Sequence, residues 1–339
     1  MNCNTRSPAH NIQQWANIDY MHDESLPAMP FPSPSGTLLE QAGADASSGQ
    51  LRTWMHALPK TIQRYLSRWQ AEWTGESLKQ GYFGYVLPCR CQDGTSAILK
   101  LSPFVHEAKE QAVALSGWAG CGGTPLLAKS FDENGAVLLI GRIIPGVALR
   151  PIDDPGGRRI ARCLQRLGHI RASLVRGSLP SGIERINALI SANACHLRAS
   201  SPSLRRHQGG IIALANDIAR SHDPQKCAVL LHGDLHAGNL LVGTDKELVA
   251  IDPTPAVGEP EQDIGDATVK NDWGQDLETR VKVLAALCNA DPVKVRAYAR
   301  LAAWNCGIFH AATGTESPGG VNPVDLLQFA VRKPRGGNN

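Results

Sequence analysis

Residues 231–252 of this chain read Leu-His-Gly-Asp-Leu-His-Ala-Gly-Asn-Leu-Leu-Val-Gly-Thr-Asp-Lys-Glu-Leu-Val-Ala-Ile-Asp. They place Asp234 two residues after a His, Asn239 five residues further on, and Asp252 after a short hairpin. Phosphoryl transfer from a nucleotide needs one carboxylate to orient and deprotonate the attacking hydroxyl. It also needs an amide oxygen and a second carboxylate to hold magnesium. The order and spacing predict such a site, with Asp234 as the base and Asn239 and Asp252 as the metal ligands.

Apolar segments around these polar residues predict a rigid frame. Residues 229–231 are typical of a short buried strand, and residues 240–242 and 248–251 of two strands of a hairpin. Because the two strands of a hairpin are antiparallel neighbours, we expect the hairpin to bring Asp252, at the end of the second strand, beside Asn239, at the start of the first.

The alternating His232, Asp234 and His236 also fit a transition-metal site, because His and Asp side chains can converge on zinc. A zinc site would leave Asn239 and Asp252 without a role, and the other histidines form no second cluster. We therefore expect His232 to brace the loop by hydrogen bonding. His236 is expected either to pack within the loop or to line the side on which the phosphate acceptor binds.

A lysine that would bind nucleotide phosphates is predicted upstream. The segment Ser-Ala-Ile-Leu-Lys ends a hairpin strand at Lys100, which suits a cation placed on the phosphates. The helix expected over residues 105–118 carries Glu107 and Glu110, and one of these acids should pair with the lysine and hold it straight. We favour Glu110.

Two further segments complete the nucleotide-binding prediction. Gly81 and Gly84, in Gly-Tyr-Phe-Gly, would let the backbone approach a triphosphate closely. Residues 139–143, Leu-Ile-Gly-Arg-Ile, would form a hinge strand in which the backbone at Ile140 and Arg142 hydrogen-bonds the adenine edge. A buried strand end is the alternative interpretation of the hinge segment.

The pattern along the chain predicts an α+β protein with strands first and helices second. The elements expected before the Pro145-Gly146 break are helices at 60–71 and 105–118 and strands at 77–80, 85–91, 96–101, 126–131 and 136–143. The helices expected after it are at 156–176, 182–198, 208–222, 261–271, 276–290 and 292–311. This order indicates an antiparallel-sheet lobe followed by a larger, mainly helical lobe.

Residues 1–55 differ from the rest of the chain. They are rich in Pro, Gly, Ser, Ala and Gln and have little periodic apolar character, which is typical of disorder. We interpret residues 1–55 as a disordered extension, 56–144 as the nucleotide-binding lobe, and 145–335 as the catalytic and substrate-binding lobe.

Composition limits the environment and the partners. The 339 residues are 42% hydrophobic and carry a net charge of +3, which suits a globular protein and gives no reason to expect a nucleic-acid or membrane partner. The nine cysteines include no C-x-x-C, which indicates reduced thiols. The start is polar, and no stretch approaches the about 18 apolar residues of a membrane span. We expect a cytoplasmic protein, and the sequence leaves its oligomeric state open.

Residues 252–278 carry eight acids against one base, Lys270. The acids are Asp252, Glu259, Glu261, Asp263, Asp266, Asp272, Asp276 and Glu278. Such a tract could attract a polycationic substrate. Acids at helix starts and on a solvated surface explain it equally well. Glu259 and Asp272 are the expected substrate contacts.

The segment His-Gly-Asp-Leu-His-x-x-Asn from His232, with the later Ile-Asp-Pro around Asp252, resembles the aminoglycoside phosphotransferase family. Val257-Gly-Glu and Ala302-Ala-Trp-Asn make the chain more similar to the branch of streptomycin 6-phosphotransferases and hydroxyurea phosphotransferases. The resemblance covers roughly residues 56–315 and omits the N-terminal extension.

The resemblance implies a two-lobed, protein-kinase-like fold that binds ATP, or another nucleoside triphosphate, with Mg²⁺. By family pattern, Asp234 matches the catalytic Asp, Asn239 and Asp252 match the metal ligands, and Lys100 matches the phosphate-binding Lys. Asp263 matches an Asp at a helix start that supports the catalytic loop from beneath.

The substrate that the resemblance implies is the hydroxyl of a cationic small molecule, foremost an aminoglycoside of the streptomycin type that phosphorylation would inactivate. One alternative is a kinase for hydroxyurea or for a housekeeping metabolite such as a sugar or an amino alcohol. The other is a catalytically inactive nucleotide-binding module, against which the intact Lys, Asp, Asn and Asp argue.

Overall fold

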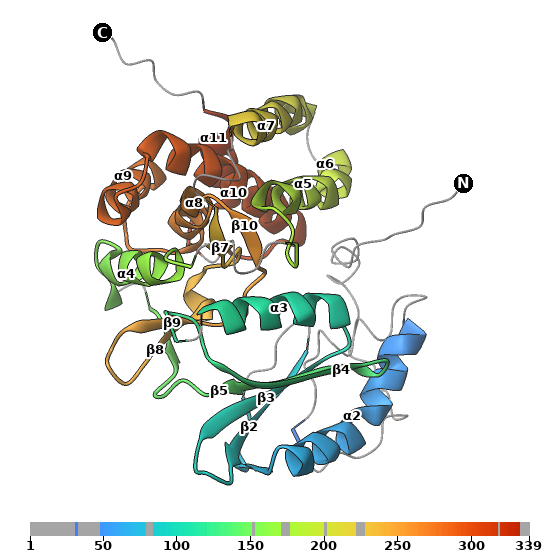
Figure 1. Cartoon of the computed structure of the whole chain (residues 1–339). Coiled ribbons are helices and arrows are strands. Elements are labelled where there is room, and N and C mark those ends of the chain that lie inside the picture. The colour runs from blue at the N-terminus through green and yellow to red at the C-terminus, as the bar shows by residue number, and fades with distance from the viewer. Residues whose placement is uncertain are drawn as a thin grey trace. The chain divides into compact units, whose positions relative to one another are not determined.

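The computed structural model describes residues 31–32, 48–78, 84–118, 120–150, 153–170, 177–199, 202–221, 228–317 and 319–332. The described residues up to Ile144 form one compact unit, the N-terminal unit, and those from Pro145 onward form a second, the C-terminal unit (Figure 1). Gly81 and most of the predicted extension lie outside the described residues.

The N-terminal unit is built on a five-stranded antiparallel sheet in the order β1-β2-β3-β5-β4. Its strands are β1 (Ala71–Trp73), β2 (Tyr85–Cys91), β3 (Ser96–Ser102), β4 (Leu126–Asp132) and β5 (Gly135–Gly141), and its helices are α2 (Ser48–Arg68) and α3 (Val105–Trp118). The turn between β2 and β3 is formed by Asp93 and Gly94, a pair that favours tight hairpins. Gly94 has φ +87°, and the Asp93 carboxylate accepts a hydrogen bond from Thr95 N at 2.9 Å.

The strand predicted over residues 77–80 is wrong at Ser77 and Leu78, which belong to no strand, and its other two residues lie outside the described part of the chain. The short strand β1 instead forms the sheet edge, where Trp73 pairs with Cys89. Three residues give too short an alternation for a sequence pattern to detect.

The two helices cover opposite faces of this sheet (Figure 1). Side chains alternate along a strand, and in β3 the buried Leu99 and Leu101 belong to the core that packs on α2. Lys100, between them, therefore points to the other face, where its amine donates a hydrogen bond to Gln111 Oε1 of α3 at 3.0 Å.

Helix α2 corrects the predicted boundary of the extension. It begins at Ser48, and its Trp54 and Met55 are 8% and 2% exposed in the core of the N-terminal unit. These residues continue the apolar stripe of Leu58 and Ile62 at helical spacing, so burying them against the sheet overrides the polar composition around them. The disorder predicted for residues 48–55 is therefore wrong.

Residues 31–32, also within the predicted extension, pack on the same unit. The rings of Phe31 and Trp73 meet edge to face, with centroids 5.6 Å apart, and Tyr85 donates its hydroxyl proton to Pro32 O at 2.8 Å. The described part of the extension thus contributes to the fold.

The C-terminal unit is mainly helical, as predicted. Its helices are α4 (Arg158–Leu167), α5 (Gly182–Ala192), α6 (Ala194–Ala199), α7 (Pro202–Ser221), α8 (Pro260–Lys270), α9 (Leu277–Cys288), α10 (Pro292–Thr313) and α11 (Pro323–Val331). α10 packs on both α8 and α11 (Figure 1). The predicted helix over 182–198 is interrupted at Asn193, and α11 was not predicted.

Two small antiparallel sheets frame the residues singled out by the sequence. One pairs β7 (Val229–Leu231) with β10 (Ala256–Gly258), and the other orders β6 (Val147–Ala148), β8 (Leu240–Val242) and β9 (Leu248–Ala250). The chain between β7 and β10 is thus closed at both ends by strand pairing. No helix in the described ranges is long and apolar enough to cross a membrane.

Replacement of Trp54 by Ala should lower the free energy of unfolding by about 3–5 kcal/mol, because a buried indole leaves a cavity that the sheet cannot close. Urea denaturation measures the change. His56→Ala, an exposed position on the same helix, is the control and should leave stability within about 0.5 kcal/mol. Equal stability of both variants would show that residues 48–55 are dispensable.

Candidate active site

Residues 232–239, called the Asp234 loop below, connect β7 to β8 and end in the 3₁₀ turn η5 (Ala237–Asn239). The hairpin that follows pairs Leu240 with Ala250, and Ile251 N donates to Asn239 O at 3.0 Å. The next residue, Asp252, therefore lies beside Asn239, as the hairpin pattern predicted.

Gly233 lets this loop lie against the segment that follows Asp252. Its φ is +75°, and a Cβ at this position would lie 2.1 Å from Thr254 O. The same segment donates a hydrogen bond from Thr254 N to His232 O at 2.9 Å. A residue with a side chain would break this contact, so only glycine fits here.

His232 braces the loop as a neutral ring. Its side chain is fully buried, and burial lowers its pKa to about 4. Nε2 lies 2.9 Å from Ile251 O, which can only accept, so Nε2 carries the proton. Nδ1 is then free to accept from Asp234 N at 3.3 Å. The ring ties the loop to the end of the hairpin, and both of its nitrogens are used.

The carboxylate of Asp234 faces three polar side chains. Oδ1 accepts from Lys270 Nζ at 2.9 Å, while Oδ2 lies 3.4 Å from Asn239 Nδ2 and 3.7 Å from His236 Nε2. Burial opposes ionisation of this group, but the charge and hydrogen bond of Lys270 together with the nearby rings of His236 and His232 outweigh it and hold the pKa of Asp234 below its usual value. The side chain keeps 37% of its surface exposed, so an ionised carboxylate is open to a ligand.

Helix α8 holds the backbone of the Asp234 loop. The carboxylate of Asp263 accepts from His232 N at 2.6 Å and from Gly233 N at 2.9 Å. Asn271, the residue directly after Lys270 at the end of α8, donates to Leu235 O at 2.9 Å. Burial raises the pKa of Asp263 to about 6 even though the two N–H groups favour its ionised form.

Sequence reasoning assigned no site role to Lys270, Asp266 or Asn271. With Asp263 they are spaced i, i+3, i+7 and i+8, which places them on one face of α8. That spacing was readable in the sequence. In the sequence these acids form part of a tract, and nothing in the sequence shows that this face of the helix is buried against a loop.

Asn239 and Asp252 have the donor set that magnesium prefers, an amide oxygen and a carboxylate. Asn239 Nδ2 donates to Asp234 O at 3.0 Å, which turns Oδ1 away from that contact. Asp252 has φ +53°, a strained conformation for a residue with a side chain, and such strain is concentrated at functional positions. The residues present therefore fit a magnesium ion.

Zinc fits the site less well. In the ranges that the structure describes, no group of three or more His, Cys, Asp and Glu side chains is arranged to hold a metal ion. His232 has both ring nitrogens engaged, and His236 Nδ1 accepts from Gly238 N at 3.1 Å.

Four of the eight acids in the tract, Glu259, Asp266, Asp272 and Glu278, form ion pairs with the protein's own cations. Glu259, whose side chain is 6% exposed, accepts from Lys294 at 2.6 Å and from Tyr298 at 3.2 Å. Asp272 accepts from Arg280 at 2.6 Å. These contacts give both acids a structural role, and their predicted contact with substrate stays a prediction.

In the N-terminal unit, the predicted partner of Lys100 also stays a prediction. Its amine bonds to Gln111, the residue next to Glu110. Glu110 is buried and lies 3.5 Å from His106 Nε2, while Glu107 is partly buried in the first turn of α3.

The predicted hinge and glycine positions are held tightly. The guanidinium of Arg142 makes two hydrogen bonds to Glu76, at 2.8 and 2.6 Å. The backbone N–H of Arg142 donates to Ser96 O at 3.0 Å. That N–H is therefore used within the sheet and is not open to adenine, whereas a role of the backbone at Ile140 stays a prediction. A Cβ on Gly84 would lie 2.6 Å from Leu101 O, so this glycine serves close backbone packing.

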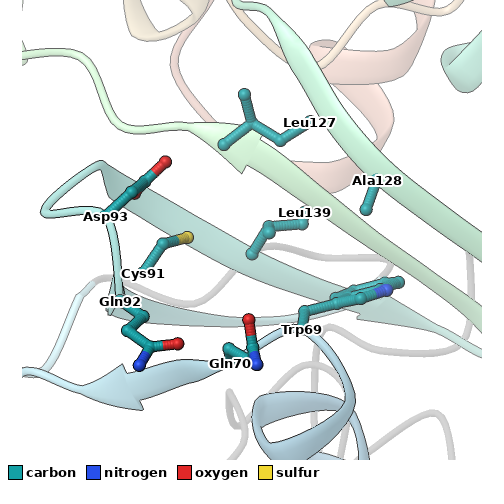
Figure 2. Close-up of a pocket in the computed structure, with 8 residues that line it drawn as sticks. All are labelled: Trp69, Gln70, Cys91, Gln92, Asp93, Leu127, Ala128 and Leu139. Atoms are coloured by element: carbon teal, nitrogen blue, oxygen red, sulfur yellow. The ribbon is translucent and has the colours of Figure 1, made fainter.

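A hollow of about 510 Å³ in the N-terminal unit lies elsewhere (Figure 2). Its lining includes Trp69, Cys91, Ala128 and Leu139, which pack with the core on the α2 face of the sheet. Lys100 points to the opposite face, so this hollow is not the predicted phosphate site.

The assigned ring state of His232 can be tested by NMR. Long-range ¹H–¹⁵N spectra should show the Nε2–H tautomer, and the ring should remain neutral from pH 8 down to about 5, because its pKa is lowered to about 4. A ring that titrates near pH 6.5, or that carries its proton on Nδ1, would contradict the assignment.

Replacement of Gly233 by Ala should destabilise the protein by about 3 kcal/mol, since it combines a positive φ with a close contact to backbone. Gly209→Ala in the exposed part of α7, where a Cβ meets nothing within 4 Å, is the matched control. It should gain about 0.5–1 kcal/mol. Thermal or urea unfolding of the two variants measures both effects, and a tolerated Gly233→Ala would reject the loop geometry.

Known proteins resemble this chain over most of its length. The hydroxyurea phosphotransferase of Kitasatospora aureofaciens is 29% identical over 257 residues, 73% of this chain and 71% of that protein. The streptomycin 6-kinase of Streptomyces griseus is 29% identical over 221 residues, 63% of this chain and 67% of that protein. The streptomycin 6-kinase of Streptomyces glaucescens is 26% identical over 288 residues, 81% and 87% of the two chains.

Solved structures share the fold at low sequence identity. A ternary complex of aminoglycoside phosphotransferase APH(4)-Ia with ADP and hygromycin B has a TM-score of 0.53 and 11% identity, over 80% of this chain and 99% of that one. A choline/ethanolamine kinase family protein from Mesorhizobium loti has a TM-score of 0.51 and 17% identity, over 79% and 90% of the two chains. These likenesses confirm the predicted α+β, protein-kinase-like fold.

The sequence model of one family matches residues 68–310, a span that contains the sheet, the Asp234 loop and most of the helices. This chain belongs to the aminoglycoside/hydroxyurea antibiotic resistance kinase family.

Proposed function

We propose that the protein transfers the γ-phosphoryl group of ATP to a hydroxyl of a small cationic molecule, foremost an aminoglycoside of the streptomycin type. The observation that carries the proposal is the ionised, partly exposed carboxylate of Asp234 beside Asn239 and Asp252. Phosphoryl transfer to a hydroxyl requires a base and magnesium ligands within one site.

Asp234 is the proposed base. Its carboxylate would accept a hydrogen bond from the acceptor hydroxyl, orient it towards the γ-phosphorus and take its proton as the bond forms. Base catalysis of this kind contributes roughly 10²–10⁴ in rate. The neutral His232 and the buried Asp263 act on this step indirectly, because they fix the backbone that carries Asp234.

Asn239 and Asp252 are the proposed magnesium ligands. Their amide and carboxylate oxygens would hold a Mg²⁺ ion, which would supply positive charge to the phosphates. The hairpin of β8 and β9 sets the separation of the two ligands, because Asn239 precedes the first strand and Asp252 follows the second.

Lys100 is the proposed phosphate-binding cation in the N-terminal unit. Its strand is central in the sheet, between β2 and β5, and Gln111 steadies its amine. Two structures that share the fold contain ADP or AMP-PNP, which supports a nucleotide as phosphoryl donor here.

The acceptor is proposed from the relatives. Streptomycin 6-kinases from two Streptomyces species support an aminoglycoside, and the hydroxyurea phosphotransferase of Kitasatospora aureofaciens supports hydroxyurea as the second candidate. Both acceptors would use the same base and metal ligands, so the Asp234 loop does not separate them.

An acceptor panel with γ-labelled ATP and Mg²⁺ tests the proposal. It should contain streptomycin, other aminoglycosides, hydroxyurea, choline and simple sugars. We expect label on streptomycin. Turnover of hydroxyurea or a metabolite without any aminoglycoside would reject the antibiotic as substrate, and calorimetry that detects no binding of Mg-ATP would reject the kinase itself.

Asp234→Asn should keep Mg-ATP affinity within about threefold while kcat falls by about 10³, because the amide keeps the shape of the carboxylate but cannot accept the proton. Steady-state kinetics and calorimetry measure the two effects. Asp325→Asn, an exposed acid in the first turn of α11, is the matched control and should leave kcat unchanged. Full turnover of Asp234→Asn would remove this residue from the mechanism.

A further inference from the structure

Lys270 is a buried cation held between two carboxylates at the end of α8. Its Nζ lies 2.9 Å from Asp234 Oδ1 and 3.0 Å from Asp266 Oδ1, and its side chain is 15% exposed. Asp266 precedes it by one helical turn on α8 and is equally buried. The lysine therefore links the side chain of the proposed base to α8, a helix that lies outside the Asp234 loop in the sequence.

We propose that Lys270 is a positioning residue for phosphoryl transfer: it holds Oδ1 of Asp234, so that Oδ2 is the atom that meets the acceptor hydroxyl. This inference rests on the proposed function, because it assigns a role in the same reaction. It goes beyond that function by naming the reacting oxygen and the group that selects it.

The contacts of the carboxylate support this choice of oxygen. Oδ1 has a short, charge-assisted bond to Lys270, whereas Oδ2 has only long contacts, 3.4 Å to Asn239 Nδ2 and 3.7 Å to His236 Nε2. The better hydrogen bond from Asn239 goes to the backbone oxygen of Asp234, at 3.0 Å. Oδ2 thus keeps accepting capacity on the side of the proposed metal ligand Asn239.

α8 is suited to this task because it holds the loop at several points. Asp263 bonds the N–H groups of His232 and Gly233, and Lys270 bonds the Asp234 side chain two helical turns further on. A lysine is a flexible chain, but the ion pair with Asp266 four residues earlier fixes its end. A misplacement of 1 Å at a reacting group can cost about 100-fold in rate, so this fixation matters to turnover.

A purely structural ion pair is the alternative, and kinetics separate the two. If Lys270 positions the base, Lys270→Met should lower kcat by about 100-fold and leave KM for Mg-ATP within threefold, and Lys270→Arg should recover at least tenfold of that loss. If the lysine only stabilises the fold, Lys270→Met should lower the unfolding midpoint and leave kcat per folded molecule within threefold of wild type, which would overturn the inference.

Two further variants serve as controls, one for an unpaired buried charge and one for the loss of an ion pair elsewhere in the unit. Lys270→Met leaves the carboxylate of Asp266 buried without a cation, so the double variant Lys270→Met/Asp266→Asn removes that charge and should fold while keeping the 100-fold loss. Arg296→Met breaks a comparable ion pair, between α10 and Glu278 of α9, outside the Asp234 loop. Its kcat should stay within threefold of wild type.

The assays use streptomycin and hydroxyurea as acceptors and follow slow hydrolysis of ATP by water in parallel. A wild-type enzyme that phosphorylates neither acceptor contradicts the proposed acceptors and not Lys270. The ratio of hydrolysis rates between wild type and variants then decides the inference, with the same 100-fold loss expected. If the double variant hydrolyses ATP or phosphorylates an acceptor at a rate within threefold of the wild-type rate, the inference about Lys270 is wrong.

Discussion

The hydrogen bonds from the backbone N–H groups of His232 and Gly233 to the buried carboxylate of Asp263 are the constraint on which the candidate site depends. The Asp234 loop turns at Gly233, which has φ +75°. Buried N–H groups need partners, and a single carboxylate on α8 satisfies both. With the backbone fixed in this way, Asp234 presents its carboxylate in one direction, and the hairpin that follows returns Asp252 to Asn239.

The contacts between α8 and the Asp234 loop bring charged side chains together in a buried place, where the charged forms are disfavoured. Asp263 has its pKa raised to about 6 and Asp266 also has a raised pKa, both chiefly by burial, while the pKa of Lys270 is raised well above its usual value because two carboxylates outweigh its burial. Buried ion pairs contribute little net stability, because desolvation offsets their attraction. We infer that the cluster is retained for geometry: α8 fixes the backbone of the Asp234 loop through one acid and its side chain through one lysine.

Local patterns in the sequence predicted much of the fold and the order of the site. The helix over 105–118 was predicted at its observed bounds, and the register of the β8–β9 hairpin followed from the apolar runs on each side of its turn. The family and the fold were also predicted correctly. What failed needed tertiary knowledge: Trp54 and Met55 look like part of a polar extension until the sheet that covers them is known. Likewise, Asp266 and Lys270 look like surface charges until the Asp234 loop is seen to cover that face of α8.

Amide hydrogen exchange tests the central claim most directly, since it reports on the two N–H groups that Asp263 binds. In the wild-type protein, the amides of His232 and Gly233 should exchange as slowly as those of the β7 core residues Leu230 and Leu231, because all would open only with the unit itself. Exchange of the His232 and Gly233 amides as fast as that of Thr244, in the exposed hairpin turn, would show that α8 does not hold the loop and would contradict this account of the site.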